Sequence, residues 1–337
     1  MSRPGPRVAV VGAGNIGRTH LNSYRQAGCA PIAIVDVNFE AARSVAQEGD
    51  LTPYRDINEL LAEVDLDAIS ICTPPALHAE IAVPALRAGV AVLCEKPMAP
   101  TITDCRTMIT AAESTGALLT IGFCHRFQPE IETIRNLVAQ GRIGTLLSFR
   151  NRFSGPLDGV ESLWFSRPEI SGGGVLMDTC VHSVDLFRYL VGEVEQVQAV
   201  MASTATQRGP AVPVEDTAVL ALQSVSGVLG VIEASWRTAP GEAVLTLSGS
   251  AGRLELDYAT LQLTLYAEDG SASPIEVARG DRFVRQARHF LACVREAEKP
   301  RVTADDGLRA VEVLSRAYAS AGRSPSTISK QRSEESA

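Results

Sequence analysis

Residues Gly12-Ala13-Gly14-Asn15-Ile16-Gly17 decide the fold, because they follow a short apolar run, Val8 to Val11, and open a helix-period segment, Asn15 to Ala27. In such a turn the first glycine permits the sharp bend, the second lets the backbone approach a pyrophosphate, and the third lets helix and strand pack closely. The helix N-terminus then offers free N–H groups to phosphates. We therefore predict that Gly12, Gly14, Asn15, Ile16 and Gly17 bind a dinucleotide; a purely structural glycine-rich turn is the alternative.

An acidic residue ends the next predicted strand, about 20 residues after the motif. Asp36 is placed to accept hydrogen bonds from the adenosine ribose hydroxyls, whereas a 2′-phosphate would meet its negative charge. Val37 and Asn38 offer no cation to hold such a phosphate, although Arg43 could reach it. We therefore predict NAD rather than NADP as the cofactor. An ordinary solvated carboxylate at a strand end is the alternative for Asp36.

The first part of the chain alternates short β-branched runs with helical patterns. The predicted strands are Val8 to Val11, Ile32 to Val37, Ala68 to Cys72, Val90 to Leu93 and Leu118 to Ile121, with helices such as Asn15 to Ala27 and Phe39 to Glu48 between them. Strands that are apolar throughout imply a sheet covered on both faces, and alternation with helices implies parallel βαβ units. This pattern predicts an α/β, doubly wound Rossmann domain over residues 1–125.

After about Thr145 the pattern changes to longer alternating segments that are typical of an antiparallel sheet. They are Leu146 to Phe153, Gln196 to Thr206, Thr217 to Gln223, Val228 to Trp236, Ala243 to Ser248, Arg253 to Asp257 and Leu261 to Tyr266. Helical patterns at Asp178 to Leu190, Phe283 to Glu298 and Asp306 to Ser320 accompany them. Residues 126–323 are thus predicted to form an α+β domain with a large, mainly antiparallel open sheet. The Ser-, Lys- and Glu-rich residues 324–337 are predicted to be a disordered tail.

Composition narrows the class of protein further. The 337 residues are 45% hydrophobic and 21% charged, which fits two globular domains, and 31 Lys and Arg against 39 Asp and Glu give a net charge of −8. Without a basic cluster, nucleic acid and anionic membranes would mostly be repelled. Seven cysteines without C-x-x-C spacing predict reduced thiols. With no signal-peptide core and no apolar run of ~20 residues, we expect a soluble, cytoplasmic protein.

Two further segments belong to the carboxyl edge of the first sheet, where ligands bind in such folds. Lys96, in Cys94-Glu95-Lys96-Pro97, is placed to act there, although a strand-end lysine is more often only a solvated charge. Thr73, Pro74 and His78 follow the strand at Ala68 to Cys72. They either pack against the cofactor or form a proline-rich turn of purely structural origin, and the residues alone favour neither.

Asp178 and His182 are four residues apart on a predicted helix that follows three glycines, so their side chains should share one face. An acid beside an imidazole orients it and raises its basicity, as oxidation of an alcohol requires. Spacing alone favours the structural alternative, a carboxylate placed by the helix dipole and a core histidine. The pair could also ligate a metal, but five histidines without an H-x-E or C-x-x-C pattern predict no metal site.

Together these motifs resemble the glucose-fructose oxidoreductase and inositol dehydrogenase family. The resemblance rests on GAGNIGRTH at 12–20, CTPPALHAE at 72–80, CEKPMA at 94–99, GFCHRFQP at 122–129, SGGGVLMDTCVHSVDL at 171–186 and TADDGLRAVEV at 303–313. It spans most of the chain. It implies an N-terminal Rossmann domain for the dinucleotide and a C-terminal domain for substrate binding and oligomerisation.

The resemblance also implies roles for single residues. In that family the lysine of E-K-P and the Asp and His of D-x-x-x-H form the site beside the nicotinamide, which here means Lys96, Asp178 and His182. Thr73, Pro74, His78, Glu95 and Lys96 are expected to contact the cofactor, and His125, Arg126 and Trp164 to join the site in binding substrate. The family often has Asn-Arg-Arg-Phe in place of residues 124–127 and Trp-Arg in place of residues 164–165, so no single relative's substrate can be copied.

The implied activity is an NAD-dependent oxidoreductase acting on a sugar, an inositol or a related polyol. His182 would take the hydroxyl proton, Asp178 would orient the imidazole or bind a neighbouring hydroxyl, and Lys96 would stabilise charge on the reacting oxygen. Two other classes stay open: a dinucleotide-binding sensor without turnover, and an NAD-dependent glycosidase. A sensor would have little need of all three residues.

Several predicted strands of the second sheet carry large apolar residues in both registers. They are Val219, Leu220 and Leu222, then Val228, Leu229, Val231 and Ile232, and further on Leu245, Leu247, Leu254 and Leu256. A second apolar face would need a partner, which predicts a homodimer or homotetramer. The resemblance implies the same, because relatives pair through this sheet. The alternative is that the chain's own helices cover everything.

Overall fold

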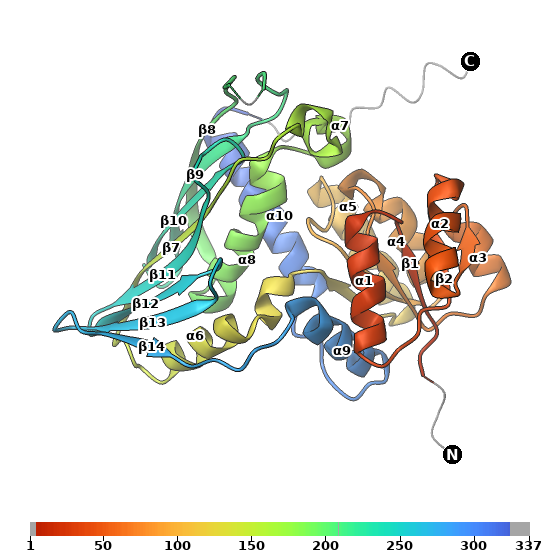
Figure 1. The fold of residues 1–337 in the computed structure, drawn as a ribbon, viewed down its shortest axis with the longest axis horizontal. Helices are drawn as coiled ribbons and strands as arrows, with labels where there is room; N and C mark the ends of the chain where they lie inside the picture. Colours follow the sequence, from red (N-terminus) through yellow and green to blue (C-terminus); the bar gives the residue numbers. More distant parts are fainter. Residues whose placement is uncertain (1–4, 208, 324–337) are drawn as a thin grey trace.

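The computed structural model describes residues 5–207 and 209–323, and it contains two sheets with helices packed between and around them (Figure 1). The first sheet is parallel, in the order β3-β2-β1-β4-β5-β6. Its strands are β1 (Val8–Val11), β2 (Ala33–Val35), β3 (Thr52–Tyr54), β4 (Ala68–Ile71), β5 (Ala91–Cys94) and β6 (Leu119–Ile121). Five of them, β1, β2, β4, β5 and β6, are buried at every residue, as their apolar runs predicted.

The helices of this part are α1 (Asn15–Gln26), α2 (Phe39–Gly49), α3 (Ile57–Glu63), α4 (His78–Arg87) and α5 (Ile102–Thr115). Side chains cap some of these helices: Asp56 accepts hydrogen bonds from the N–H groups of Asn58 and Glu59 at the start of α3, and Thr101 accepts one from Asp104 N–H at the start of α5. The doubly wound Rossmann fold predicted from the sequence is confirmed.

The second sheet has eight strands in the order β14-β13-β12-β11-β7-β10-β9-β8. They are β7 (Leu146–Ser154), β8 (Val194–Ala202), β9 (Thr217–Ser224), β10 (Leu229–Ser235), β11 (Glu242–Gly249), β12 (Gly252–Asp257), β13 (Gln262–Ala267) and β14 (Ala272–Ile275). Only the pairing of β7 with β10 is parallel among these described strands. The predicted large, mainly antiparallel sheet is therefore confirmed.

The remaining helices are α6 (Pro129–Ala139), α7 (Pro168–Ser171), α8 (Val181–Leu190), α9 (Arg282–Val294) and α10 (Ala304–Ser320). From the sequence pattern, the last two are expected to belong to the second domain alone. The structure instead packs α9 against α1, and Ala287, Phe290 and Leu291 join the core of the first sheet. Helix α10 lies between the two sheets, against α5 and β6 on one side and α8 and β8 on the other. The predicted tail, 324–337, lies outside the described residues.

Helices α6, α8 and α10 lie over one face of the second sheet, while the other face carries no helix in the described part of the chain (Figure 1). The expectation of two apolar faces needs correction, because Leu245, Leu247, Leu254 and Leu256 are all fully buried on the helix side. The open face carries both apolar and charged side chains. Val200, Val219, Leu229 and Val231 are exposed on β8 to β10, and Glu233 beside them pairs with Arg150 and Arg152 of β7.

No helix among the described residues is both long enough and apolar enough to cross a membrane.

Candidate active site

The glycine turn between β1 and α1 has two positions where only glycine fits. A Cβ on Gly12, which has φ +107°, would lie 2.6 Å from the Cys72 carbonyl oxygen, and one on Gly17 would lie 1.8 Å from that of Gly12. A Cβ on Gly14 would meet no atom within 4 Å, so open space lies in front of the helix N-terminus. Gly14 caps α1 without a side chain, and the first N–H groups of the helix face that space.

A cavity of about 700 Å³ lies beside this turn, a size suited to a cofactor. Residues predicted to bind the dinucleotide form much of its wall: Gly12, Gly14, Asn15, Ile16, Asp36, Thr73 and Pro74. The hydroxyl oxygen of Thr73 is buried and has no hydrogen-bond partner, which leaves it available to a ligand. The open helix end, the unpartnered hydroxyl and the cavity volume all fit a bound dinucleotide.

Asp36 lies in the cavity wall and stabilises the glycine turn through hydrogen bonds to the backbone. Its Oδ2 accepts a hydrogen bond from Ala13 N at 2.8 Å, and its Oδ1 accepts one from Asn38 N at 2.8 Å. Arg55, just after β3, also lines the cavity, and its guanidinium lies 4.1 Å from the centre of the Phe39 ring. Arg55 was not predicted from the sequence, because β3 was not predicted. Arg43, the cation that the sequence suggested, pairs with Glu40 at 3.3 Å.

His78 and Glu95 were expected to contact the cofactor directly, but the structure places both behind the cavity wall. The imidazole of His78 is fully buried, with Nδ1 3.0 Å from the Pro97 carbonyl oxygen and Nε2 2.9 Å from that of Thr73. Glu95 Oε1 lies 3.0 Å from His20 Nε2. His78 therefore joins the loop after β4 to the loop after β5, and so fixes Lys96 relative to the cavity.

Lys96 stands at the end of β5 and contacts a residue of the second domain. Its Nζ donates hydrogen bonds to Asp178 Oδ1 at 2.9 Å and to the Asp178 carbonyl oxygen at 2.8 Å. Burial lowers the pKa of Lys96, but the negative charges of Asp178 and Glu95 outweigh that effect, and the pKa lies above its ordinary value. Lys96 is therefore a charged hydrogen-bond donor held in one place.

Asp178 owes its position to a π-helical turn, Leu176–Cys180, that leads into α8. Glu215 fixes the start of this turn, because its Oε1 accepts hydrogen bonds from Gly174 N at 2.9 Å and Leu176 N at 3.1 Å. Any Cβ on Gly174 would lie 1.9 Å from the Glu215 carbonyl oxygen, so a glycine is required there. π-helical turns of this kind are frequent at functional sites.

His182 lies one turn further along and is not hydrogen-bonded to Asp178, contrary to the expectation from their spacing. The other carboxylate oxygen of Asp178 accepts a hydrogen bond from Thr179 Oγ1 at 3.1 Å. His182 Nδ1 is buried without a partner. Burial and the nearby charges of Lys96 and Arg282 hold the pKa of His182 well below its usual value. The imidazole is therefore neutral with a free lone pair, and its basicity is lowered rather than raised as the spacing from Asp178 suggested.

Two family models match the chain. One, described as an oxidoreductase family with an NAD-binding Rossmann fold, covers residues 6–123, and the other, the GFO/IDH/MocA C-terminal domain, covers residues 131–255. The chain belongs to the GFO/IDH/MocA oxidoreductase family. This confirms the family expected from the motifs, and it makes the chain an NAD(P)-dependent oxidoreductase.

Curated relatives in this family match nearly the whole chain. The D-apiose dehydrogenase of Paraburkholderia graminis is 28% identical, over 93% of this chain and 87% of that protein. The myo-inositol 2-dehydrogenase of Thermotoga maritima is 29% identical, over 90% and 93%. A solved levoglucosan dehydrogenase in complex with NADH and levoglucosan shares the fold, with a TM-score of 0.87 at 24% identity over 94% of this chain and 97% of that chain.

His125, Trp164 and Arg126 were expected to bind substrate together, but the structure places them in three separate surroundings. His125 is buried beside His182, with ring centres 4.8 Å apart, and burial lowers the pKa of His125 to about 3. Trp164 instead lines the dinucleotide cavity. The guanidinium of Arg126 is engaged in ion pairs, because it donates to both carboxylate oxygens of Asp185 and to Asp306.

Sequence reasoning missed Tyr258, which follows β12 and approaches the same site. Its ring centre lies 5.6 Å from that of His125, and its hydroxyl is buried without a hydrogen-bond partner. The side-chain nitrogen of Gln128, whose amide oxygen lies 3.2 Å from His125 Nδ1, is also buried and unpartnered. No motif marks either residue. Unpartnered polar atoms around His125 are suited to hydroxyl groups of a ligand.

Proposed function

We propose that this chain is an NAD-dependent dehydrogenase that oxidises a CH–OH group of a sugar, an inositol or a related polyol. The main support is the Lys96–Asp178 pair, at 2.9 Å, beside the neutral imidazole of His182. A charged donor and a neutral acceptor are the two groups that removal of an alcohol proton needs. The names of the two curated relatives support a polyhydroxylated substrate.

Each residue then has one task. When bound, the nicotinamide supplies the hydride acceptor. Lys96 donates a hydrogen bond to the reacting oxygen and stabilises its developing negative charge, while His182 accepts the hydroxyl proton. Asp178 keeps Lys96 charged and directed at the substrate. This replaces the role in which Asp178 orients His182.

The proposal is tested by incubating the protein with NAD and a panel of inositols, aldopentoses, aldohexoses and anhydrosugars while following NADH absorbance. We expect turnover with at least one polyol. Tight NAD binding without turnover on any of them would favour a sensor. Release of nitrophenol from a nitrophenyl glycoside, dependent on NAD, would favour a glycosidase.

We predict tighter binding of NAD than of NADP. Asp36 would repel a 2′-phosphate, and a repulsion of about 1.4 kcal/mol gives a tenfold difference. The double variant Asp36→Ala/Asn38→Arg should narrow or reverse this preference. Arg55→Ala is measured beside it, because Arg55 is the cation that lines the cavity and so is placed to affect the same preference. Calorimetry that shows NADP bound more tightly by the unmodified protein would contradict the prediction.

We also predict that the open face of the second sheet mediates a symmetric dimer, which can pair further into a tetramer. Val200 is 78% exposed and Leu229 58% exposed, beside the Arg–Glu pairs, a mixture typical of protein interfaces. Light scattering should give two or four chains of 35.8 kDa. Val231→Asp should reduce that mass, whereas Val225→Asp, in the turn after β9, should not. A single-chain mass for the unmodified protein at micromolar concentration would refute the prediction.

A further inference from the structure

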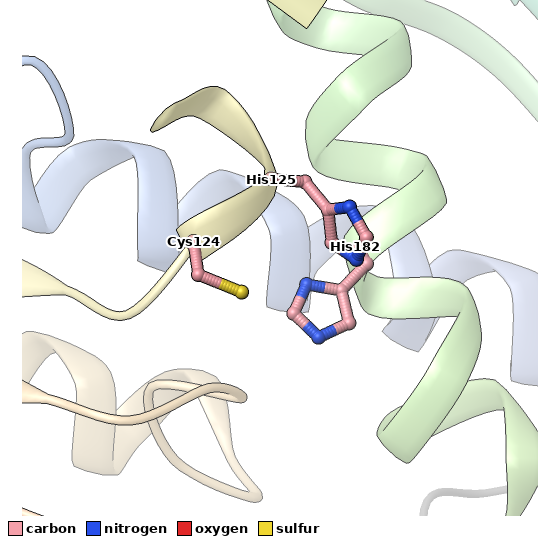
Figure 2. Close-up of side chains that lie close together, drawn as sticks. All are labelled: Cys124, His125 and His182. Carbon is pink, nitrogen blue, oxygen red and sulfur yellow. The ribbon is translucent and has the colours of Figure 1, made fainter. Parts of the chain in front are cut away.

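A thiol and two imidazoles converge next to the proposed site (Figure 2). Cys124 and His125 begin a 3₁₀ turn, Cys124–Phe127, just after β6, and His182 projects from α8. The Sγ atom and one nitrogen of each ring all lie within 4.8 Å of one another. Cys124 and His125 are buried, while His182 is half-buried, so the group is reached past His182. The two domains thus bring together three side chains of the types that bind transition metals.

The surroundings leave ring nitrogens available to a ligand. His125 Nδ1 lies 3.2 Å from the amide oxygen of Gln128 and donates to it, which leaves the lone pair on Nε2. A second-shell hydrogen bond of this kind orients histidine ligands in metal sites. His182 Nδ1 is buried and has no partner at all. An unpartnered buried nitrogen aimed at a thiol and a second imidazole is an independent sign of a missing ligand.

We propose that Cys124, His125 and His182 bind a thiophilic divalent cation such as Zn²⁺, with a fourth coordination position left for water. Tetrahedral Zn–S bonds of about 2.3 Å and Zn–N bonds of about 2.0 Å place the ligand atoms roughly 3.3 to 3.6 Å apart. The three atoms must therefore approach by about an ångström, which small side-chain rotations provide. Binding converts the Cys124 thiol to a thiolate and releases one proton to solvent.

Neighbouring charge limits the strength of this site. Lys96 and Arg282 both act electrostatically on Cys124, and their positive charges oppose a bound cation. We therefore expect micromolar affinity, weaker than that of a structural zinc site. A bound cation also occupies His182, whose lone pair would otherwise accept the substrate proton. Zn²⁺ should then inhibit turnover in competition with substrate, a consequence that rests on the proposed function.

A second Cys–His pair provides the control. Cys293 Sγ lies 3.5 Å from His289 Nε2, but that nitrogen accepts a hydrogen bond from Arg301 N at 2.9 Å, and Nδ1 lies 2.6 Å from Glu298. Both nitrogens of His289 are therefore engaged. Zn²⁺ should not bind there.

Calorimetric titration of the untagged full chain with ZnCl₂, without cofactor or substrate, tests the site directly. We expect one equivalent bound, with an enthalpy that depends on the buffer because a proton is released. Cys124→Ser and His125→Asn should each weaken binding at least about tenfold, and Cys293→Ser should not. With Co²⁺, a sulfur-to-cobalt charge-transfer band should appear in the unmodified protein and in Cys293→Ser, but not in Cys124→Ser.

Absence of the cobalt–sulfur band in the unmodified, folded protein would overturn the proposal even where a variant fails to fold. Equal loss of Zn²⁺ binding in Cys124→Ser and Cys293→Ser would also overturn it. Zn²⁺ that binds but raises turnover would overturn the inhibitory role. If no substrate is found, the titrations still decide whether the metal site exists, so its failure is distinguishable from failure of the proposed function.

Discussion

Turnover is expected to fall at least about a hundredfold when Lys96 is replaced by alanine, while NAD still binds. In the proposed mechanism Lys96 Nζ, held by Asp178, supplies positive charge to the reacting oxygen, and Lys96 does not line the dinucleotide cavity. Groups that transfer protons or stabilise such charge typically contribute about 10² to 10⁴ in rate, or roughly 3 to 5 kcal/mol of barrier. Steady-state kinetics with the best polyol, alongside calorimetry with NAD, measure both effects.

His182→Ala should give a loss of similar size, because it removes the proposed acceptor of the hydroxyl proton. The exposed Lys299 provides the matched control, and Lys299→Ala should leave turnover unchanged. Near-normal turnover in both Lys96→Ala and His182→Ala would show that the site lies elsewhere.

The first sheet could be predicted from the sequence because local signals determine it. Gly17 is required by a clash within the turn and Gly12 by its φ of +107°, and β1 and β4 on either side of that turn are short, fully buried runs. Strand β3 escaped notice because it is three residues long, contains Pro53 and buries only Tyr54. Arg55, the cation that lines the cavity, directly follows this strand and was therefore not predicted either. Short edge strands carry little periodicity, so only the fold reveals them.

The sequence predicted which residues form the candidate site better than it predicted which of them contact one another. The spacing of Asp178 and His182 assumed a regular α-helix, but the π-helical turn at Leu176–Cys180 changes the rotation between them and directs Asp178 to Lys96. Ion pairs between residues far apart in the sequence could not be predicted either. Arg126 finds Asp185 only after α8 has packed against the turn that follows β6. The grouping of Cys124 and His125 with His182 depends on the same packing.

Arg126→Met is expected to destabilise the protein by about 3 to 5 kcal/mol without raising KM for the substrate. The guanidinium is 5% exposed and the Asp185 carboxylate 1% exposed, and their closest atoms are 2.5 Å apart. Removing one partner of a buried ion pair leaves the other charge buried without compensation, which is strongly destabilising. The midpoint of urea-induced unfolding measures the loss, and KM of the folded variant measures substrate binding.

The double variant Arg126→Met/Asp185→Leu separates the two roles of Arg126. Apolar side chains of similar volume often replace a buried pair at little cost, so the double variant should recover much of the lost stability. Asp306 keeps Arg188 as a partner, at 3.3 Å, and is only partly buried, so it tolerates the change. A substrate-binding arginine would behave differently. KM would then rise in both variants, and removing Asp185 would restore neither affinity nor turnover.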